Sequence, residues 1–268
     1  DEPPVEIHGP VAILVEDTLS ALQTLAAARR ARRSDLRVVG VTGSVGKTTT
    51  KEAIASVLGQ KYCVLKSEGN HNNEIGLPLT LMSLDDRHSH AVLEMGMYDL
   101  GEIALLCRIA RPDVGVVTNV LPIHLERLGT IEKIAEAKSE LPAALVSGGV
   151  AVLNGDDQRV AAMPLEEGVT RLLCGLGENN HVRAIEIENL GLEGVRFTAR
   201  VSGLQDLAVE DAEYKLQTST IGRHTVNAAL LAVAVGFVEG LSWEQIAAGL
   251  LAQGHGLRLV PRTGRDGV

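Results

Sequence analysis

The sequence predicts an α/β fold, with a P-loop in a doubly wound, mostly parallel sheet flanked by helices and a small antiparallel sheet appended. Three observations predict it. A valine-rich strand at residues 36–41 leads into a glycine-rich turn and a helix. Short apolar strands then alternate with helical segments up to residue 174, which is typical of parallel sheets. After residue 180, polar and apolar residues alternate in three runs separated by turn residues, as in antiparallel strands.

The elements are predicted in chain order. Three prolines in residues 1–10 indicate an extended connector, and an amphipathic pattern indicates a helix from Thr18 into a run of arginines. We interpret that run as the solvated end of the helix. Core strands are expected at 36–41, 90–95, 113–120, 149–154 and 171–174, and further helices at 100–109 and 130–146. The alternating runs span 181–187, 194–201 and 207–216, and two helices follow, one from Gly222 and one capped by Ser242.

Composition excludes several classes of protein. The chain has 268 residues, 45% of them hydrophobic, which is enough for one large domain or two small ones. A net charge of −9 argues against a nucleic-acid surface, because phosphate backbones are bound by clustered Lys and Arg. Three separated cysteines suggest neither disulfides nor a zinc site, so we expect a cytoplasmic protein. The longest apolar stretch, 226–238, is too short to span a membrane, and no signal peptide is visible.

Residues 43–50, GSVGKTTT, form a variant phosphate-binding loop. The backbone of Gly43 to Gly46 can surround phosphate oxygens, Lys47 can pair with phosphate charge, and the Thr48 hydroxyl can ligate Mg²⁺. The strict motif has a glycine six residues before the lysine, where this chain has Val41. A glycine-rich turn without a ligand remains the alternative.

Two further residues follow core strands. Glu94 ends an otherwise apolar strand next to the strand that leads into the loop, where a carboxylate could hold Mg²⁺. The alternative is a glutamate that simply leaves the sheet into solvent. His124 lies shortly after the third strand, and a lone histidine there is as easily structural as a ligand.

Lys138 occupies a core-facing position of the helix at 130–146, in line with Ile134 and Leu141. Burying an unpaired lysine is costly, so Lys138 either extends to solvent or has a partner or a modification. As a carbamate it would become a carboxylate, and it could then hold a cation together with Glu94 and His124.

Three amides, Asn70, Asn72 and Asn73, lie in the run GNHNNEIGLPLT. Amides both donate and accept hydrogen bonds, which suits the rim of a polar substrate site. They suit an ordinary turn equally well.

Five blocks occur in one order: TGSVGKTTTKE, GNHNNEIGLPLTL, LEMGMYDLGEIALLCRIARPDVGVVTNVLPIHLERLG, EAKSEL and IGRH. Together they resemble the Mur ligases of peptidoglycan synthesis, and the blocks are closest to the member that adds D-alanyl-D-alanine. The resemblance implies the end of an N-terminal domain with a linker helix at 1–33, a central ATP-binding domain at 34–254, and a linker at 255–268 toward a missing C-terminal domain. Because the chain begins at Asp1 and ends in a polar tail, we expect a fragment of a longer protein.

The resemblance also implies a set of site residues, with ATP and Mg²⁺ as cofactors. Catalytic roles would belong to Lys47, Lys138 and His124; metal binding to Thr48, Glu94, His124 and Lys138, the lysine that the family carbamylates; and substrate binding to Asn70, Asn72 and Asn73. Nucleotide contacts would come from Gly43, Ser44, Val45, Gly46, Lys47, Thr48, Thr49, His224 and Asn227. The family usually has Asn directly after the histidine of GRH and again three residues later, where this chain has Thr225 and Ala228.

The implied function is an ATP-dependent ligase whose substrates are UDP-MurNAc-peptide and D-Ala-D-Ala. ATP would phosphorylate the peptide carboxylate, and the amine would attack the resulting acyl phosphate. We expect a monomer without nucleic-acid partners. A related ligase acting on another acidic substrate, and a nucleotide-binding module without turnover, remain open as alternatives.

Overall fold

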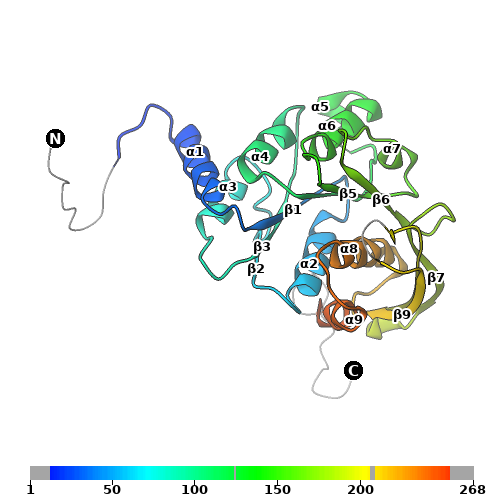
Figure 1. The fold of residues 1–268 in the computed structure, drawn as a ribbon. Coiled ribbons are helices and arrows are strands. Elements are labelled where there is room, and N and C mark those ends of the chain that lie inside the picture. The colour runs from blue at the N-terminus through cyan, green and yellow to red at the C-terminus, as the bar shows by residue number, and fades with distance from the viewer. Residues whose placement is uncertain (1–12, 124, 206–208, 254–268) are drawn as a thin grey trace, which may run out of the picture.

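The structure, a computed structural model, describes residues 13–123, 125–205 and 209–253 (Figure 1). In these residues a nine-stranded sheet has the order β2-β3-β1-β4-β5-β6-β7-β8-β9. The strands from β2 to β7 in this order pair in parallel, and β8 pairs antiparallel with both β7 and β9. The predicted fold class is confirmed. The antiparallel part continues the parallel sheet, because β7 pairs with β6 through Cys174 with Val182 and Gly175 with Arg183.

The strands are β1 Arg37–Thr42, β2 Val64–Lys66, β3 His90–Glu94, β4 Val114–Val117, β5 Val150–Asn154, β6 Thr170–Gly175, β7 Val182–Asn189, β8 Val195–Val201 and β9 Ala212–Thr218. The helices are α1 Thr18–Ala31, α2 Lys47–Leu58, α3 Gly76–Met82, α4 Glu102–Ala110, α5 Leu125–Leu128, α6 Ile131–Ala143, α7 Gln158–Ala161, α8 Val226–Val238 and α9 Trp243–Ala252. Two short 3₁₀ turns, Gly191–Glu193 and Arg223–Thr225, complete the described elements.

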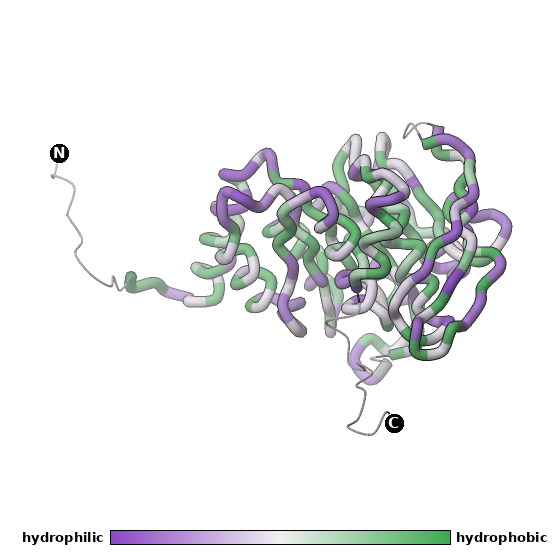
Figure 2. Tube along the Cα trace, turned by 90° about the horizontal axis from the view of Figure 1, so that it is seen from below, coloured by the Kyte–Doolittle hydropathy of each residue, from purple (hydrophilic) through white to green (hydrophobic). Residues whose placement is uncertain are grey.

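Helices cover both faces of the sheet (Figure 1). Val39 and Val41 of β1 pack into a core with α2, α8 and α9, whereas Val38 packs into a second core with α1, α3, α4 and α6. This explains why the central strands are apolar at every position rather than at alternate ones. Figure 2 shows the same arrangement, with hydrophobic stretches through the middle of the molecule and hydrophilic ones in the peripheral connections.

The sequence did not predict β2, α3, α5 and α7. Three of these four elements are only three or four residues long, too few to establish a period. The predicted third strand at 113–120 is also too long, since β4 ends at Val117. The N–H of the next residue, Thr118, makes one more bond to β1 at the Thr42 carbonyl (3.0 Å), and its hydroxyl donates to the Val45 carbonyl of the phosphate loop (2.8 Å).

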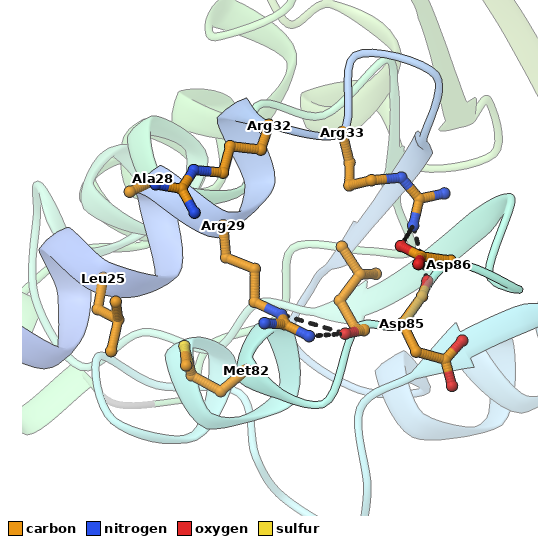
Figure 3. A pocket seen from close by; sticks show the side chains of 9 residues that line it. Leu25, Ala28, Arg29, Arg32, Arg33, Met82, Asp85 and Asp86 are labelled. Carbon is orange, nitrogen blue, oxygen red and sulfur yellow. Dashed lines mark hydrogen bonds and ion pairs between the residues drawn. The ribbon is translucent and has the colours of Figure 1, made fainter. Parts of the chain in front are cut away.

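The arginine run at the end of α1 is solvated only in part: Arg29 and Arg32 are exposed, whereas the interpretation was wrong for Arg30. Arg30 is buried, with its Nε 2.9 Å from the carbonyl of Ala110, the last residue of α4. Arg29 donates to Leu84, and Arg33 donates to Asp85 and contacts Asp86 (Figure 3). These bonds span more than 50 residues of sequence, so tertiary packing decides them.

A cavity of about 250 Å³ lies where α1 meets the segment after α3 (Figure 3). Its lining combines the apolar side chains of Leu25 and Met82 with the arginines of α1. Arg33 and Asp85 precede β1 and β3, so the cavity lies toward the amino edge of the parallel strands, opposite the phosphate loop. The domain boundary predicted near residue 33 remains a prediction, and the predicted linker at 255–268 lies outside the described residues.

Candidate nucleotide and metal site

The phosphate loop connects β1 to α2 and requires glycine at two positions. Gly43 has φ +143° and Gly46 has φ +86°, both in the region that favours glycine. A Cβ on Gly43 would also collide with the Thr118 hydroxyl. Gly46 is the N-cap of α2, and its surroundings are open. The loop can therefore keep this shape only with the glycines that the motif supplies.

Residues after β4 hold the loop in place. The Ser44 N–H donates to the Asn119 carbonyl (2.9 Å), and the Val45 N–H donates to the Asn119 side chain (2.9 Å). Two of the loop's predicted phosphate donors are thus already used. The first backbone bond at the start of α2 runs from Thr50 to Gly46 (2.9 Å), so the helix-start N–H groups left for an anion are those of Lys47, Thr48 and Thr49.

Lys47 lies over its own loop. Its Nζ donates to the carbonyls of Gly43 (2.9 Å) and Ser44 (3.2 Å). Burial lowers the pKa of Lys47, and the charge of Glu94 partly offsets that effect. A phosphate would offer the ammonium group a charged partner in place of two neutral carbonyls.

Glu94 does not leave the sheet into solvent, because only 2% of its surface is exposed. One carboxylate oxygen accepts from the Thr48 hydroxyl (2.9 Å), and the other accepts from the Asn72 amide (2.8 Å). Its backbone N–H donates to the Ser67 hydroxyl (3.1 Å). Residues from α2, from the loop after β2 and from β3 therefore meet at one carboxylate.

Lys138 is buried, with 2% of its surface exposed, as the helical period predicts. One turn further along α6, Leu141 lies directly over Gly40 and Gly115, where a Cβ would crowd it. These glycines let α6 approach the sheet closely and keep Lys138 inside. Burial, and next the charge of Lys47, lower the pKa of Lys138 to about 7. The alternative of a lysine that extends to solvent does not hold.

The remaining predicted site residues differ in their hydrogen bonds and in their exposure. Asn72 reaches Glu94, whereas Asn73 accepts from the Gly76 N–H at the start of α3 (2.8 Å) and Asn70 is exposed. His224 is exposed in a 3₁₀ turn, and the buried Oδ1 of Asn227 has no hydrogen-bond partner within the described residues. His124 lies outside the described residues. Substrate and nucleotide roles for these residues remain predictions.

The donor set suits Mg²⁺ that is shared with a nucleotide. The described residues contain no group of three or more His, Cys, Asp and Glu side chains that could hold a metal. Thr48 and Glu94 instead supply one hydroxyl and one carboxylate, already side by side. Mg²⁺ in phosphate-transfer sites typically takes one or two carboxylates and completes its shell with water and phosphate oxygens.

Sequence reasoning missed three residues of this site, namely Ser67, Thr118 and Asn119. Each acts on a segment distant in sequence, Ser67 on β3 and the other two on the phosphate loop. A Thr-Asn pair directly after a core strand, at the edge where the loop lies, was the available signal for two of them.

A family model described as the Mur ligase middle domain matches residues 41–236. The chain belongs to the Mur ligase family. A UDP-N-acetylmuramoyl-tripeptide–D-alanyl-D-alanine ligase of Bacillus subtilis is 40% identical over 92% of this chain and 50% of the relative. The chain thus spans about half the length of the curated Mur ligases that it matches.

Solved Mur ligase structures agree with this assignment. A crystal structure of MurF from Acinetobacter baumannii covers 92% of this chain and 52% of that protein, with a TM-score of 0.81 and 32% identity. MurF from Thermotoga maritima, solved in complex with ADP, covers 88% of this chain and 53% of its own, with a TM-score of 0.76 and 30% identity. No described helix of this Mur ligase chain is long and apolar enough to cross a membrane.

Proposed function

We propose that this chain forms the ATP- and Mg²⁺-binding centre of a ligase that joins D-alanyl-D-alanine to a UDP-MurNAc-tripeptide. The observation that carries the proposal is the hydrogen bond between Thr48 and Glu94 at the carboxyl edge of the sheet, with the charge of Glu94 acting on Lys47 and that of Lys47 acting on Lys138. The names of the relatives support the choice of substrates. We also propose that the protein is a cytoplasmic monomer, since both ATP and a UDP-linked peptide are cytoplasmic compounds.

The electrostatic problem of the reaction is that two anions must meet. A peptide carboxylate attacks the terminal phosphate of ATP, and the acyl phosphate formed is then attacked by the amine of D-Ala-D-Ala. Lys47 would exchange its loop carbonyls for phosphate oxygens, and the free N–H groups at the start of α2 would bind the same phosphates. The N–H groups would need little reorganisation, whereas Lys47 would have to break its bonds to the Gly43 and Ser44 carbonyls.

Thr48 and Glu94 would hold Mg²⁺, with Asn72 fixing the orientation of the Glu94 carboxylate. When bound, Mg²⁺ would neutralise charge on the phosphates and on the approaching carboxylate. Lys138 and His124 would serve a second Mg²⁺, with Lys138 as a carbamate. A pKa of about 7 supports this role, because the neutral amine is the form that reacts with CO₂. His224 and Asn227 would lie on the nucleoside side, and Asn70, Asn72 and Asn73 on the side of the muramoyl-peptide.

The test is turnover in a hybrid in which residues 13–253 replace the matching segment of the Bacillus subtilis relative. Phosphate release should require both UDP-MurNAc-tripeptide and D-Ala-D-Ala, and Glu94→Gln should reduce the rate at least about a hundredfold. Glu213→Gln, on the outer strand β9, is the matched control and should leave the rate unchanged. Turnover with a different acidic substrate would overturn the substrate assignment. A folded, ATP-binding hybrid that lacks turnover would favour the module that only binds nucleotide.

A further inference from the structure

Lys51 is a second buried lysine near the phosphate loop, and the proposed reaction does not use it. It lies on α2 one turn after Lys47, with 0% of its surface exposed. Its Nζ donates to the Ser67 carbonyl (2.6 Å) and is 3.2 Å from a carboxylate oxygen of Glu52. Fully buried lysines are rare and require such partners, so the contact with Ser67 calls for a functional explanation.

Ser67 connects this lysine to the backbone of Glu94. The Ser67 N–H donates to the Val92 carbonyl (3.1 Å), and its hydroxyl accepts from the Glu94 N–H (3.1 Å). Ser67 therefore lies along the last residues of β3 and bonds the backbone of the residue that carries the carboxylate. Lys51 links this position to α2, the helix that carries Thr48.

Asn72, in the same loop, bonds the side chain of Glu94, whereas Ser67 bonds its backbone. Its carbonyl accepts from the Gly96 N–H (2.7 Å), and its side chain donates to the carboxylate (2.8 Å). A Cβ on Gly96 would lie 3.0 Å from the Asn72 side chain, so glycine permits this close approach. The loop from Ser67 to Asn72 thus supports Glu94 from two sides, and Lys51 attaches it to α2.

Glu52 keeps the buried ammonium paired. Burial alone would raise the pKa of Glu52, but hydrogen bonds from Lys66 and Lys51 lower it below its usual value. The carboxylate therefore stays ionised at neutral pH and offsets the charge of Lys51. Lys66 immediately precedes Ser67, so Glu52 contacts two neighbouring parts of the same support.

We propose that Lys51 is a positioning residue that sets the distance between Thr48 on α2 and Glu94 on β3. This inference rests on the proposed Mg²⁺ site. The two oxygen donors come from different elements, and a shared cation requires them at a fixed separation. Without Lys51, the loop that carries Ser67 and Asn72 loses its buried bond to α2 and keeps the more exposed pair of Lys66 with Glu52, so Glu94 is held less firmly relative to Thr48.

The test measures metal–nucleotide coupling, defined as the Kd of ADP without metal divided by its Kd with Mg²⁺. Calorimetry on this chain supplies both values. Lys51→Met keeps the size of the side chain and removes its donors, and it should lower the coupling about tenfold, the usual effect of losing a support behind a metal ligand. The Kd of ADP without metal should stay within about twofold, because Lys47 and the helix N–H groups are unchanged.

Ser56→Ala is the matched control. Ser56 lies on the same helix, but its hydroxyl donates to the Gly249 carbonyl (2.7 Å) on α9, away from Glu94. This variant should lower stability and leave the coupling unchanged. Equal losses of coupling in Ser56→Ala and Lys51→Met would mean that Lys51 has only a structural role, and this outcome would overturn the inference.

Ser67→Ala provides a second, smaller change in case Lys51→Met does not fold. It removes the acceptor for the Glu94 N–H and should lower the coupling about threefold, while the double variant should lose less than the product of the two single effects. Unchanged coupling in Ser67→Ala, or full additivity with Lys51→Met, would contradict the proposed route. If the original chain shows no coupling, the Mg²⁺ site itself fails. If it shows coupling that Lys51→Met preserves, only the present inference fails.

Discussion

The two edges of the parallel sheet carry buried charges in opposite ways. At the amino edge, Arg37 binds both carboxylate oxygens of Glu239 (2.9 and 3.2 Å), and His90 lies 3.2 Å from the same carboxylate. Asp113 contacts Arg37 from the other side (3.3 Å). The hydrogen bond to Glu239 raises the pKa of Arg37, and the contacts with His90 and Arg37 lower that of Glu239 despite its burial. At this edge, Arg37 and Glu239 are therefore each paired with groups of opposite charge.

At the carboxyl edge, by contrast, the charged side chains bond neutral groups. Among the described residues, Lys47 has only neutral carbonyls as hydrogen-bond partners, and burial lowers the pKa of both Lys47 and Lys138. Glu94 is engaged by the neutral donors Thr48 and Asn72. One sheet therefore has an edge whose charges are paired with one another and another whose lysines would gain from binding an anion, as the proposed function requires. Variants at the two edges should separate binding from stability.

The largest expected effect is that of Lys47→Ala on nucleotide binding. Mg·ATP affinity should fall at least about a thousandfold, because the ammonium is the main positive charge at the loop. Stability should not fall, since Lys47 is desolvated without a charged partner that compensates fully. Calorimetry and urea unfolding measure the two quantities. Lys61→Ala, at a lysine that contacts the Gly240 carbonyl, is the control, and tight binding by Lys47→Ala would disprove the assignment.

Glu239→Gln should have the opposite profile. It should cost about 2 kcal/mol of stability, because Arg37 and His90 lose a shared buried carboxylate, and it should leave Mg·ATP binding unchanged. The contribution of Glu239 is fully present above pH ~4.5 and is lost as the pH falls through its lowered folded-state pKa. Urea unfolding at pH 7 and pH 3 checks both points. An equal deficit of the variant at both pH values would argue against this source of stability.

Lys138→Met should change how stability depends on pH. The folded protein releases the Lys138 proton at about pH 7, whereas the unfolded chain keeps it up to about pH 10.5. Between these values the unfolded state binds more protons, so Lys138 makes stability increase with pH by up to about 1 kcal/mol per unit. The variant should lack this increase and be more stable near pH 7. Parallel pH profiles would show that the amine is not desolvated, and carbamylation can be read from the mass of the intact protein under CO₂.

The smallest expected effect is that of Asn119→Ala. This change removes the hydrogen bonds of the Asn119 side chain to Val45 and should weaken Mg·ATP binding by about fivefold, through a loop that is less well held. Asn189→Ala, at the end of strand β7, is a control of the same residue type. Titration calorimetry resolves a difference of this size. A thousandfold loss would mean that Asn119 contacts the nucleotide directly.

The sequence anticipated much of the site where its signal is local. Glycine spacing, the lysine and threonines after it, and the apolar strand before it lie within about fifteen residues, so the phosphate loop was predicted correctly as a strand, turn and helix. The helical period similarly predicted that Lys138 faces the core. The carboxylate at the end of β3 was identified because it interrupts an apolar run.

The sequence did not predict contacts between residues that lie far apart in the chain. The buried position of Arg30 was not predicted, because a charge run carries no information about the carbonyls of residues 84, 85 and 110 that the arginines at the end of α1 reach. Lys51 was not predicted as a site residue for the same reason, since its partner Ser67 lies sixteen residues away in a loop. Asn72 and Asn73 are neighbours in sequence, yet one donates to the Glu94 carboxylate and the other accepts from the start of a helix.

By itself, then, the sequence determined the fold class, the phosphate loop and the inward position of Lys138, because periodicity and glycine chemistry act over one or two turns of chain. Only the tertiary structure decided which side chains converge on Glu94, how Asn119 holds the loop, and that the amino edge pairs its charges while the carboxyl edge does not. Those outcomes depend on which strands become neighbours in the sheet, and the order β3-β1-β4 places residues 42, 94 and 118 side by side although they are far apart in the chain.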